Sequence, residues 1–538
     1  MTGPAQQRVR KFWGWGYEDQ QPSHEEVEAA AAGIVAHLGF GANDVERPAR
    51  VEDLDLPGPR LAPPSALEEI CAADPHTRAS HALGKAYRDV VRAFRGQLDH
   101  PPDVVAFPRD EQELEQVLDW CASAGAAAIP YGGGTSVVGG VEPRFEQPAV
   151  SVDLGGLTGV REVDPVSLAA RIGGGMTGPA LEDALREHDL TLRHYPQSFE
   201  LSTLGGWIAT RAGGHFATGP THIDDLVESV RALTPEGVWE SRRLPGSGAG
   251  PSPDRLLIGS EGILGVITEA WMRVRPRPRF RASASLGFAS FAQGAAAVRA
   301  LAQSGLEPAN CRLLDPAEAG LTGAGDGETA VLVLGFESAD HPLDAWLARG
   351  LELCRDHGGE PRGEPRLSGP GDQGGGREGS AGAWRSAFLQ APYLRDTMVA
   401  AGVLSETFET AITWDRFDSF VAEVRERAEQ AVTQECGEGR VSCRLTHAYP
   451  DGAAPYFTVL APARRGSEVE QWDAVKAAVT ETLIAAGGTV THHHAVGRDH
   501  RPGGYDVQRP DPFVEALRAA KRAVDPEGIL NPGVLIDP

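Results

Sequence analysis

The sequence predicts an α+β protein with more than one domain, and three features of the chain support this prediction. With 538 residues, the chain is longer than a single hydrophobic core usually accommodates. Between residues 101 and 278, short segments rich in Val, Ile and Leu alternate with helical patterns and many glycines. From residue 279 onward, longer helical patterns alternate with further strands.

Composition divides the chain into four segments. These are an N-terminal extension (1–100), a first domain (101–278), a second domain (279–488) and a C-terminal segment (489–538) that we expect to return to the first domain. The extension contains an aromatic, glycine-rich patch at residues 12–17, an Ala/Glu-rich helical stretch at Glu25–His37 and a proline-rich linker at Pro57–Pro64.

Several helices and strands can be placed from local patterns. Asp110 and Glu113 resemble a capping box that opens an amphipathic helix at Glu111–Ala124, and Ala127–Pro130 follows as a short buried strand. In the second domain we expect helices at Phe291–Ser304, Leu343–Asp356 and Phe417–Glu435, strands at Thr329–Phe336 and Tyr456–Ala461, and a mobile loop at Gly363–Gly382.

The charge balance limits the classes of partner. The chain has 75 acidic and 50 basic residues, a formal net charge of −25. Nucleic acids and anionic membranes need a basic face, so neither is an expected partner. A local cationic pocket for a small anionic substrate is compatible with an acidic exterior.

Cysteine usage and hydropathy are typical of a cytoplasmic protein. The six cysteines form no C-x-x-C pair, so the sequence indicates neither a zinc knuckle nor a disulfide framework. The N-terminus lacks the apolar run of a signal peptide, and no stretch approaches the ~18 apolar residues of a membrane span. The oligomeric state stays open, with a homodimer as one expectation.

A glycine-rich loop follows the strand at Ala127–Pro130. The segment Pro130-Tyr131-Gly132-Gly133-Gly134-Thr135-Ser136-Val137 lets the backbone adopt positive φ and turn several N–H groups toward one point. Such a nest binds pyrophosphate, with hydroxyl donors from Thr135 and Ser136. It is neither a Walker loop nor the Rossmann fingerprint. When this segment is considered by itself, a surface turn is an equally good interpretation of it.

Three further glycine-punctuated segments favour a ligand-binding role. They are residues 194–207 (HYPQSFELSTLGGW), residues 210–214 (TRAGG) and residues 259–268 (GSEGILGVIT). Each could be a structural turn, but four such segments in this order are hard to explain as turns alone.

The four segments together resemble the FAD domain of the vanillyl-alcohol oxidase / p-cresol methylhydroxylase superfamily. Motifs elsewhere resemble its alkyldihydroxyacetonephosphate synthase (alkylglycerone-phosphate synthase) branch: FWGWGYED near the start, CRLLD at 311–315, APYLRD at 391–396, FET at 408–410, Tyr456-Phe457, HHHAVG at 492–497 and VDPEGILNPG near the end. The resemblance implies a two-lobed FAD domain with an α+β substrate cap, and the flavin ring at their interface.

The resemblance also implies which residues hold FAD. They are Pro130, Tyr131, Gly132, Gly133, Gly134, Thr135, Ser136, Gln197, Ser198, Ser202, Thr203, Gly206, Thr210, Arg211, Ala212, Gly213, Glu261, Gly262, Ile263, Leu264, Gly265, Val266 and Ile267. Many relatives attach the flavin covalently through a His or Cys. Because this loop carries Thr135 and Ser136, and Cys121 lies in the preceding helix, we expect non-covalent FAD.

Candidate catalytic residues follow from the same resemblance. Tyr456 matches the family's proton-transferring tyrosine, and His492, His493 and His494 match its histidine triple. Arg312 matches an arginine important for activity and Arg395 one that binds substrate, and a guanidinium suits phosphate or carboxylate. Thr407 lies where the family places a small hydroxyl residue near the pocket. Without the resemblance, Tyr456 would be read as a core aromatic and the two arginines as surface residues.

The histidine triple also has a geometric interpretation. On an extended segment, His492 and His494 would share one face and His493 the other. One metal ion could not easily use all three, and no carboxylate lies at a suitable spacing. We therefore predict no metal site.

The family's reaction is redox-neutral: flavin N5 binds acyl-dihydroxyacetone phosphate covalently, the acyl group leaves and a fatty alcohol replaces it as an ether. Two positions depart from the family pattern. Gln197 stands where the synthases usually have aspartate, and the short polar stretch Leu321–Glu328 stands where they have a long apolar helix. A small anionic ketone or ester is therefore the broader expectation for the substrate.

Three functions remain open. The first is a synthase-like flavoenzyme acting on an anionic keto or ester substrate. The second is an FAD-dependent oxidase or dehydrogenase of a 2-hydroxy acid or alcohol, with Tyr456 and a histidine as base. The third is a non-catalytic flavin-binding protein, which the combination of Tyr456, two arginines and the histidines disfavours.

Overall fold

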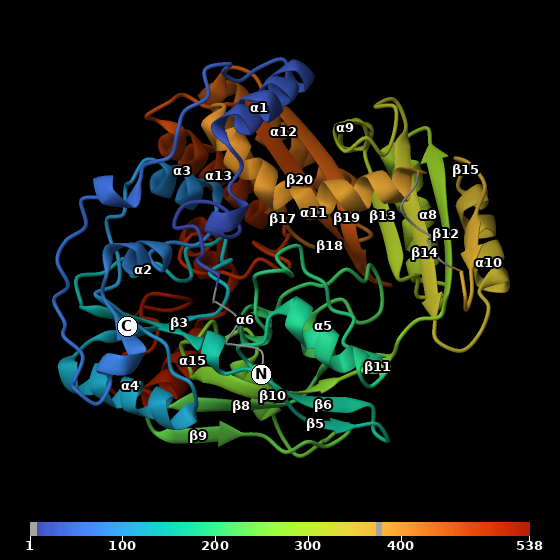
Figure 1. The fold of residues 1–538 in the computed structure, drawn as a ribbon. Coiled ribbons are helices and arrows are strands. Elements are labelled where there is room, and N and C mark those ends of the chain that lie inside the picture. Colours follow the sequence, from blue (N-terminus) through green and yellow to red (C-terminus); the bar gives the residue numbers. More distant parts are fainter. Residues whose placement is uncertain (1–7, 373–378, 538) are drawn as a thin grey trace.

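The structure, a computed structural model, describes residues 8–372 and 379–537 and confirms the α+β prediction. The described residues form three main sheets with helices packed on and between them (Figure 1). None of the helices in these residues is both long and apolar enough to cross a membrane.

Two smaller sheets form the part of the fold that carries the glycine-rich segments. The first has the order β1 (Cys71–Ala72), β2 (Val104–Ala106), β4 (Ala149–Asp153), β3 (Ala127–Tyr131). The second has the order β5 (Val160–Asp164), β6 (Ala169–Gly173), β10 (Val266–Arg273), β8 (Val227–Thr234), β9 (Gly237–Glu240), with β7 (Leu190–Thr191) and β11 (Arg275–Pro276) paired separately. Helices α4 (Glu111–Ala124), α5 (Gly178–Arg186), α6 (Leu204–Thr210) and α7 (Pro253–Leu257) connect these strands.

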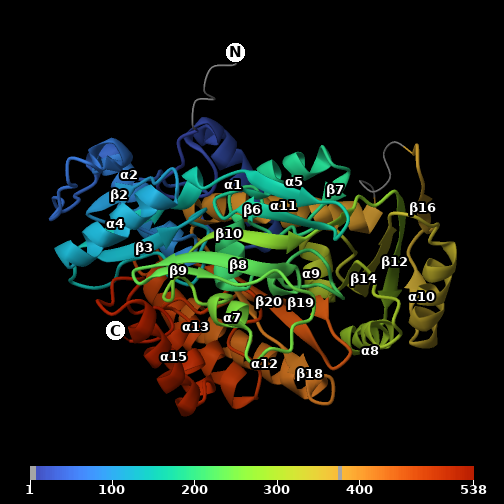
Figure 2. The ribbon, with the colours of Figure 1, turned by 90° about the horizontal axis from the view of Figure 1, so that it is seen from below.

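The large sheet has nine strands. They are β15 (Glu360–Pro361), β12 (Phe280–Phe288), β14 (Ala330–Ser338), β13 (Asn310–Leu314), β19 (Arg440–Ala448), β20 (Gly452–Pro462) and β17 (Val403–Glu409), with β16 (Arg366–Ser368) on β12 and β18 (Ile412–Thr413) on β20. Its helices are α8 (Phe291–Ala302), α9 (Pro316–Leu321), α10 (Asp344–Asp356), α11 (Gly379–Ala400), α12 (Phe417–Cys436) and α13 (Glu468–Ala485). Figures 1 and 2 show this sheet beside the smaller ones.

Both ends of the chain join these units. The N-terminal part adds α1 (His24–Leu38), α2 (Pro75–Ser80) and α3 (Tyr87–Phe94), and Phe12 and Trp13 are buried in the core of the large sheet. The C-terminal part adds α14 (Asp506–Gln508) and α15 (Asp511–Val524). Leu530 pairs with Ala128 of β3, so the chain end lies against the first small sheet (Figure 2).

Local predictions are largely confirmed. Helix α4 has the expected bounds, and the Asp110 carboxylate accepts a hydrogen bond from Glu113 N, as a helix N-cap does. The Glu113 side chain accepts from Arg109 N, so the reciprocal half of the capping box is shifted by one residue. The other expected helices and strands match α8, α10, α12, β14 and β20. The predicted loop Gly363–Gly382 contains β16 and leads into α11, while its residues 373–378 lie outside the described residues.

Candidate active site

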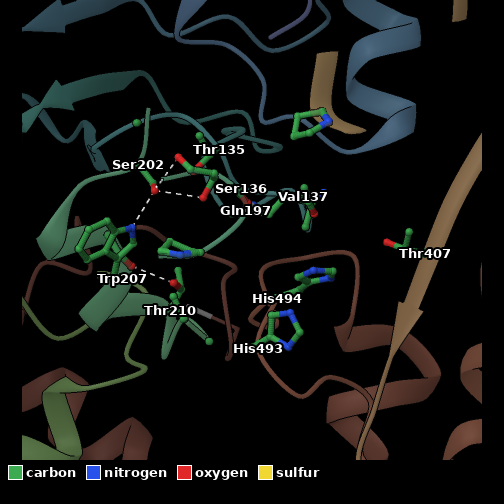
Figure 3. A pocket seen from close by; sticks show the side chains of 18 of the residues that line it. Thr135, Ser136, Val137, Gln197, Ser202, Trp207, Thr210, Thr407, His493 and His494 are labelled. Atoms are coloured by element: carbon green, nitrogen blue, oxygen red, sulfur yellow. Dashed lines mark hydrogen bonds between the residues drawn. The ribbon is translucent and has the colours of Figure 1, made fainter. Parts of the chain in front are cut away.

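One cavity of about 410 Å³ lies between the smaller sheets and the large sheet, and both sides contribute to its lining. Figure 3 shows Thr135, Ser136 and Gln197 on one side, His493 and His494 facing them, and Thr407 on strand β17. The chain therefore brings together residues that are more than 300 positions apart in sequence.

The glycine-rich loop leaves β3 and lines this cavity with residues 132–137. Among the described residues, no hydrogen-bond acceptor lies opposite the backbone N–H groups of residues 133–137. Gly134 is buried and the other four residues are half-buried. Successive unpaired N–H groups in such a loop form a nest that fits a ligand with acceptor oxygens. Glycine is required here, since a Cβ on Gly132 would collide with Thr203 Oγ1 and one on Gly133 with the Leu201 carbonyl.

Most residues predicted to hold the cofactor line the same cavity. In addition to the loop, these are Pro130, Gln197, Ser198, Ser202, Thr203, Gly206, Thr210, Ala212, Gly213, Glu261, Gly262, Gly265, Val266 and Ile267. Burial raises the pKa of Glu261 to about 7, although its carboxylate accepts hydrogen bonds from the backbone N–H groups of Val496 and Gly497.

Four of the predicted cofactor residues do not line the cavity. Tyr131 is buried and its hydroxyl donates to the Ser80 carbonyl. Arg211 has a left-handed backbone (φ 53°) and donates to Asp224. Ile263 and Leu264 are buried in the core of the second small sheet. The predicted set of FAD-binding residues therefore contains residues that line the cavity and also residues that pack behind the cavity-lining loops.

Tyr456 lies in the cavity wall directly opposite Arg444 on the neighbouring strand. The Arg444 guanidinium carbon is 3.7 Å from the centre of the Tyr456 ring. Arg444 also donates to the buried Glu318 carboxylate and, at 3.2 Å, to Thr458 Oγ1. The two arms of a hairpin therefore hold a positive charge over the phenol ring.

The two predicted arginines reach the cavity from different elements. Arg312, on β13, is buried and donates to the carbonyls of His215 (2.8 Å) and Thr446 (3.4 Å). Burial lowers its pKa to about 10, so the side chain still carries its charge at neutral pH. Arg395, on α11, donates to the Lys85 carbonyl at 2.8 Å, and its buried Nε has no partner among the described residues. Both guanidinium groups can bind an anion.

The predicted alternation of the histidine triple is wrong. The backbone N–H groups of His492, His493 and His494 all donate to the carboxylate of Glu409, at the end of β17. An extended strand would point successive N–H groups in opposite directions, so the segment instead curls around Glu409. As a result His493 and His494 line the cavity, while His492 lies behind them.

Burial keeps the histidines in their neutral form. It lowers the pKa of His493 to about 3, and it lowers the pKa of His492 and His494 well below the ordinary value. Burial also raises the pKa of Glu409 to about 7. Glu409 comes from a strand more than 80 positions earlier, so residue spacing around the histidines does not indicate it.

One group among the described residues could hold a metal ion. Ligand atoms of His447, His492 and His493 lie within 4.8 Å of one another. His492 Nδ1 and His493 Nδ1 are 2.9 Å apart, a hydrogen-bond distance, so a proton shared by these two nitrogens and a metal ion bound by both are alternatives at this position.

Several cavity residues were not foreseen from the sequence. On β19, Arg444, Thr446 and His447 line the cavity, and a register shift between Leu445 and His447 explains why neighbours 446 and 447 both reach it. The alternation of polar side chains in the segment CRLTH (443–447) is the sequence signal that indicates these residues. An apolar wall is formed by Trp15, Leu321, Phe388, Leu394, Met398 and Leu460. These side chains come from four separate segments, so no single stretch of the sequence indicates the apolar wall.

Comparison with known families agrees with this organisation. Residues 102–241 match the family described as "FAD binding domain". Residues 277–535 match the family described as "FAD linked oxidases, C-terminal domain". Both matched ranges contribute residues to the cavity lining.

Individual relatives and solved structures are similar over most of the chain. An alkyldihydroxyacetonephosphate synthase of Caenorhabditis elegans is 31% identical over 86% of this chain and 80% of its own length. That of Dictyostelium discoideum is 28% identical over 86% and 78%, respectively. A solved alkyldihydroxyacetonephosphate synthase shares the fold, with a TM-score of 0.80, 24% identity and coverage of 98% of this chain and 99% of that one.

Proposed function

Because this chain belongs to the FAD-linked oxidases of the vanillyl-alcohol oxidase / p-cresol methylhydroxylase superfamily, in the branch of the alkyldihydroxyacetonephosphate synthases, we propose that it forms an ether from an acylated keto phosphate and an alcohol. One observation carries the proposal. A single cavity holds an unsatisfied backbone nest, the guanidinium groups of Arg312 and Arg395, Tyr456 and two histidines.

The nest at residues 133–137 would hold the FAD diphosphate, with Thr135 and Ser136 as hydroxyl donors. Bound there, FAD would supply a ring that can react with a carbonyl carbon and accept or return electrons. We propose that the cofactor is non-covalent, because none of the six cysteines lines the cavity in the described residues. The cavity histidines His447, His493 and His494 belong to the opposite, large-sheet side.

Side chains of the cavity would bind the substrate and transfer protons. Arg312 and Arg395 would bind the anionic end of the substrate, since a guanidinium suits a phosphate. Tyr456 would hold or release a proton at its hydroxyl beneath the charge of Arg444. His493 would exchange a proton with the substrate through its Nε2, because its Nδ1 already contacts His492 and Glu409.

The apolar wall supports a substrate with an aliphatic chain. Trp15, Phe388, Met398 and Leu460 line the cavity, and the Phe388 ring centre lies 5.7 Å from the Arg312 guanidinium carbon, so the apolar side chains adjoin the anion-binding arginine. Leu394 lines the cavity and is 38% exposed, so this wall reaches the surface. Burial of a chain there would contribute about 0.8 kcal/mol per methylene.

A second function, oxidation of a 2-hydroxy acid or alcohol, is favoured by the match of residues 277–535 to the FAD-linked oxidases. Arg312 or Arg395 would then bind a carboxylate, and His493 would take the hydroxyl proton. The two functions differ in electron flow, because only the oxidation leaves the flavin reduced.

The test begins with purified, FAD-loaded protein. Acid precipitation should release FAD into the supernatant, whereas a coloured pellet would contradict non-covalent binding. The protein is then given an acyl-dihydroxyacetone phosphate with a radiolabelled long-chain alcohol, or a 2-hydroxy acid without oxygen. Labelled ether product without loss of flavin colour supports the synthase. Bleaching by the hydroxy acid without ether product supports the oxidation instead.

A further inference from the structure

A chain of hydrogen bonds leads from the cavity toward the surface. His493 Nδ1 lies 2.9 Å from His492 Nδ1, and His492 Nε2 lies 2.7 Å from the Tyr449 hydroxyl. That hydroxyl lies 2.8 Å from Thr221 Oγ1 and 3.5 Å from His222 Nδ1. Thr221 Oγ1 is in turn 3.3 Å from His222 Nδ1. The chain thus links a cavity residue with the partly exposed Tyr449 and His222.

Backbone contacts fix the direction in which this chain can carry a proton. His222 Nε2 lies 2.9 Å from the His492 carbonyl, which can only accept, so Nε2 carries the proton. With its proton on Nε2, the His222 ring presents Nδ1 as an acceptor toward Tyr449 and Thr221. Each earlier member can then accept on its cavity side and donate on its outer side.

The members have the protonation states that such transfer needs. The two ring nitrogens of His492 face different partners, His493 Nδ1 on the cavity side and the Tyr449 hydroxyl on the outer side, so one nitrogen can accept while the other donates. Burial raises the pKa of Tyr449, so its hydroxyl keeps its proton and can accept and donate at once. No described residue donates to or accepts from His493 Nε2, which leaves that nitrogen for a ligand in the cavity.

We propose that His493, His492, Tyr449, Thr221 and His222 form a proton relay between the cavity and solvent. When His493 Nε2 takes a proton, its Nδ1 proton passes to His492 Nδ1 and the His492 Nε2 proton passes to Tyr449. The Tyr449 proton then passes, directly or through Thr221, to His222 Nδ1, from which solvent removes it. One proton leaves and no electron moves. The use of the relay in turnover rests on the proposed function.

The relay is tested by Tyr449→Phe, which removes only one hydroxyl. The backbone carbonyl of Tyr449 still accepts from Trp414 Nε1, and its N–H still donates to the Gly452 carbonyl. Tyr505→Phe is the matched control, because Tyr505 is also half-buried and lies outside the cavity lining and the relay. Thr221→Val should have a smaller effect, since Tyr449 still reaches His222.

Two readouts are measured on each variant. In protein labelled with ¹⁵N-histidine, exchange of the His493 ring N–H with solvent should be slower in Tyr449→Phe than in wild type and in Tyr505→Phe. In turnover of the FAD-loaded enzyme, Tyr449→Phe should lower the rate about 100-fold, the low end of a positioned proton transfer. Added imidazole should restore part of that rate by carrying the proton through solvent.

The turnover measurement tests the proposed function, and the exchange measurement tests the relay independently of it. If wild type turns over none of the probe substrates, the proposed function is rejected, while the exchange measurement still decides the relay. Equal ring N–H exchange in Tyr449→Phe and wild type would overturn the relay, whatever the turnover. So would a stoichiometric metal ion in the purified protein bound by His492 and His493, because it would occupy their relay nitrogens.

Discussion

The guanidinium of Arg444 lies over the ring of Tyr456, 3.7 Å from its centre, on the facing strand of the β19–β20 hairpin. This contact joins a residue expected from sequence to one that was not. A buried ion pair with Glu318 fixes the position of the guanidinium. The charge over the phenol ring is therefore part of the site and is not a mobile surface charge.

Replacing Arg444 by methionine should lower turnover about 30-fold. A desolvated cation–π contact contributes about 2 kcal/mol, and that energy corresponds to this change in rate. The variant should also be less stable by about 3–5 kcal/mol, because Glu318 loses its buried partner. Steady-state kinetics and urea unfolding measure the two effects.

A double variant separates stability from chemistry at this site. Arg444→Met with Glu318→Gln removes the unpaired charge, so most of the stability should return while turnover stays low. Recovery of turnover together with stability would show that Arg444 only holds the fold together.

Replacing Glu409 by glutamine should disorder the histidine segment. The carboxylate accepts from three successive backbone N–H groups and from Thr491 Oγ1, and an amide group cannot accept all of these bonds. Buried donors left unsatisfied cost about 1–3 kcal/mol. We expect that loss of stability together with a fall in kcat and unchanged FAD affinity, measured by urea unfolding, kinetics and fluorescence titration.

Glu182 supplies a matched control for Glu409. Its buried carboxylate accepts from Thr191 Oγ1 and from the backbone N–H groups of Leu192 and Arg193, away from the cavity lining. Glu182→Gln should lose similar stability and keep kcat. If both variants lose kcat equally, Glu409 acts through general stability and does not position the histidines.

Replacing Gly133 by alanine should abolish FAD binding in folded protein. The new Cβ would lie 2.7 Å from Ser202 Cα and would collide with the Leu201 carbonyl, so the loop must move away from the cavity. Visible flavin absorbance after gel filtration measures the loss. Gly33→Ala is the control, because a Cβ there meets nothing within 4 Å and alanine favours helix α1. Normal flavin content in Gly133→Ala would show that the loop does not hold the diphosphate.

Stability should fall as pH decreases below about 6.5, the pKa of an unfolded histidine. Burial lowers the pKa of His500 to about 3, so between these values the unfolded chain binds a proton that the folded chain does not. The contribution of neutral His500 to the free energy of unfolding is complete above pH 6.5 and is lost progressively as the pH falls toward 3. His500→Asn should reduce the slope of unfolding free energy against pH by about 1.4 kcal/mol per unit between pH 6 and 4. An unchanged slope would contradict a neutral buried ring.

Replacing Arg395 by methionine should weaken binding of an anionic substrate. A hydrogen bond to a charged group contributes about 1.5–3 kcal/mol, so KM should rise roughly 10- to 150-fold. FAD content should not change, because Arg395 comes from α11 on the large-sheet side. A KM equal to that of wild type would place the anion at Arg312 alone.

Local sequence determined many of the helices and strands of this protein and its glycine-rich loop. Capping at Asp110, the buried strand before Gly132 and the long helical patterns depend on neighbours within a few residues, so they can be read from the chain. The resemblance of four glycine-rich segments indicated an FAD-binding family, and the matches to the two FAD family models confirm it. By contrast, the roles of Arg444, Glu318 and Glu409 depend on strand register and on contacts across 80 or more positions.

Only the tertiary structure decided which face each side chain presents. The histidine triple reads as an extended strand in isolation, but a buried carboxylate gathers its three N–H groups and turns two of the rings into the cavity. The physical reason is that backbone N–H groups inside the fold need an acceptor, and here the acceptor is a carboxylate from a distant strand. Periodicity along the chain contains no information about such a distant acceptor.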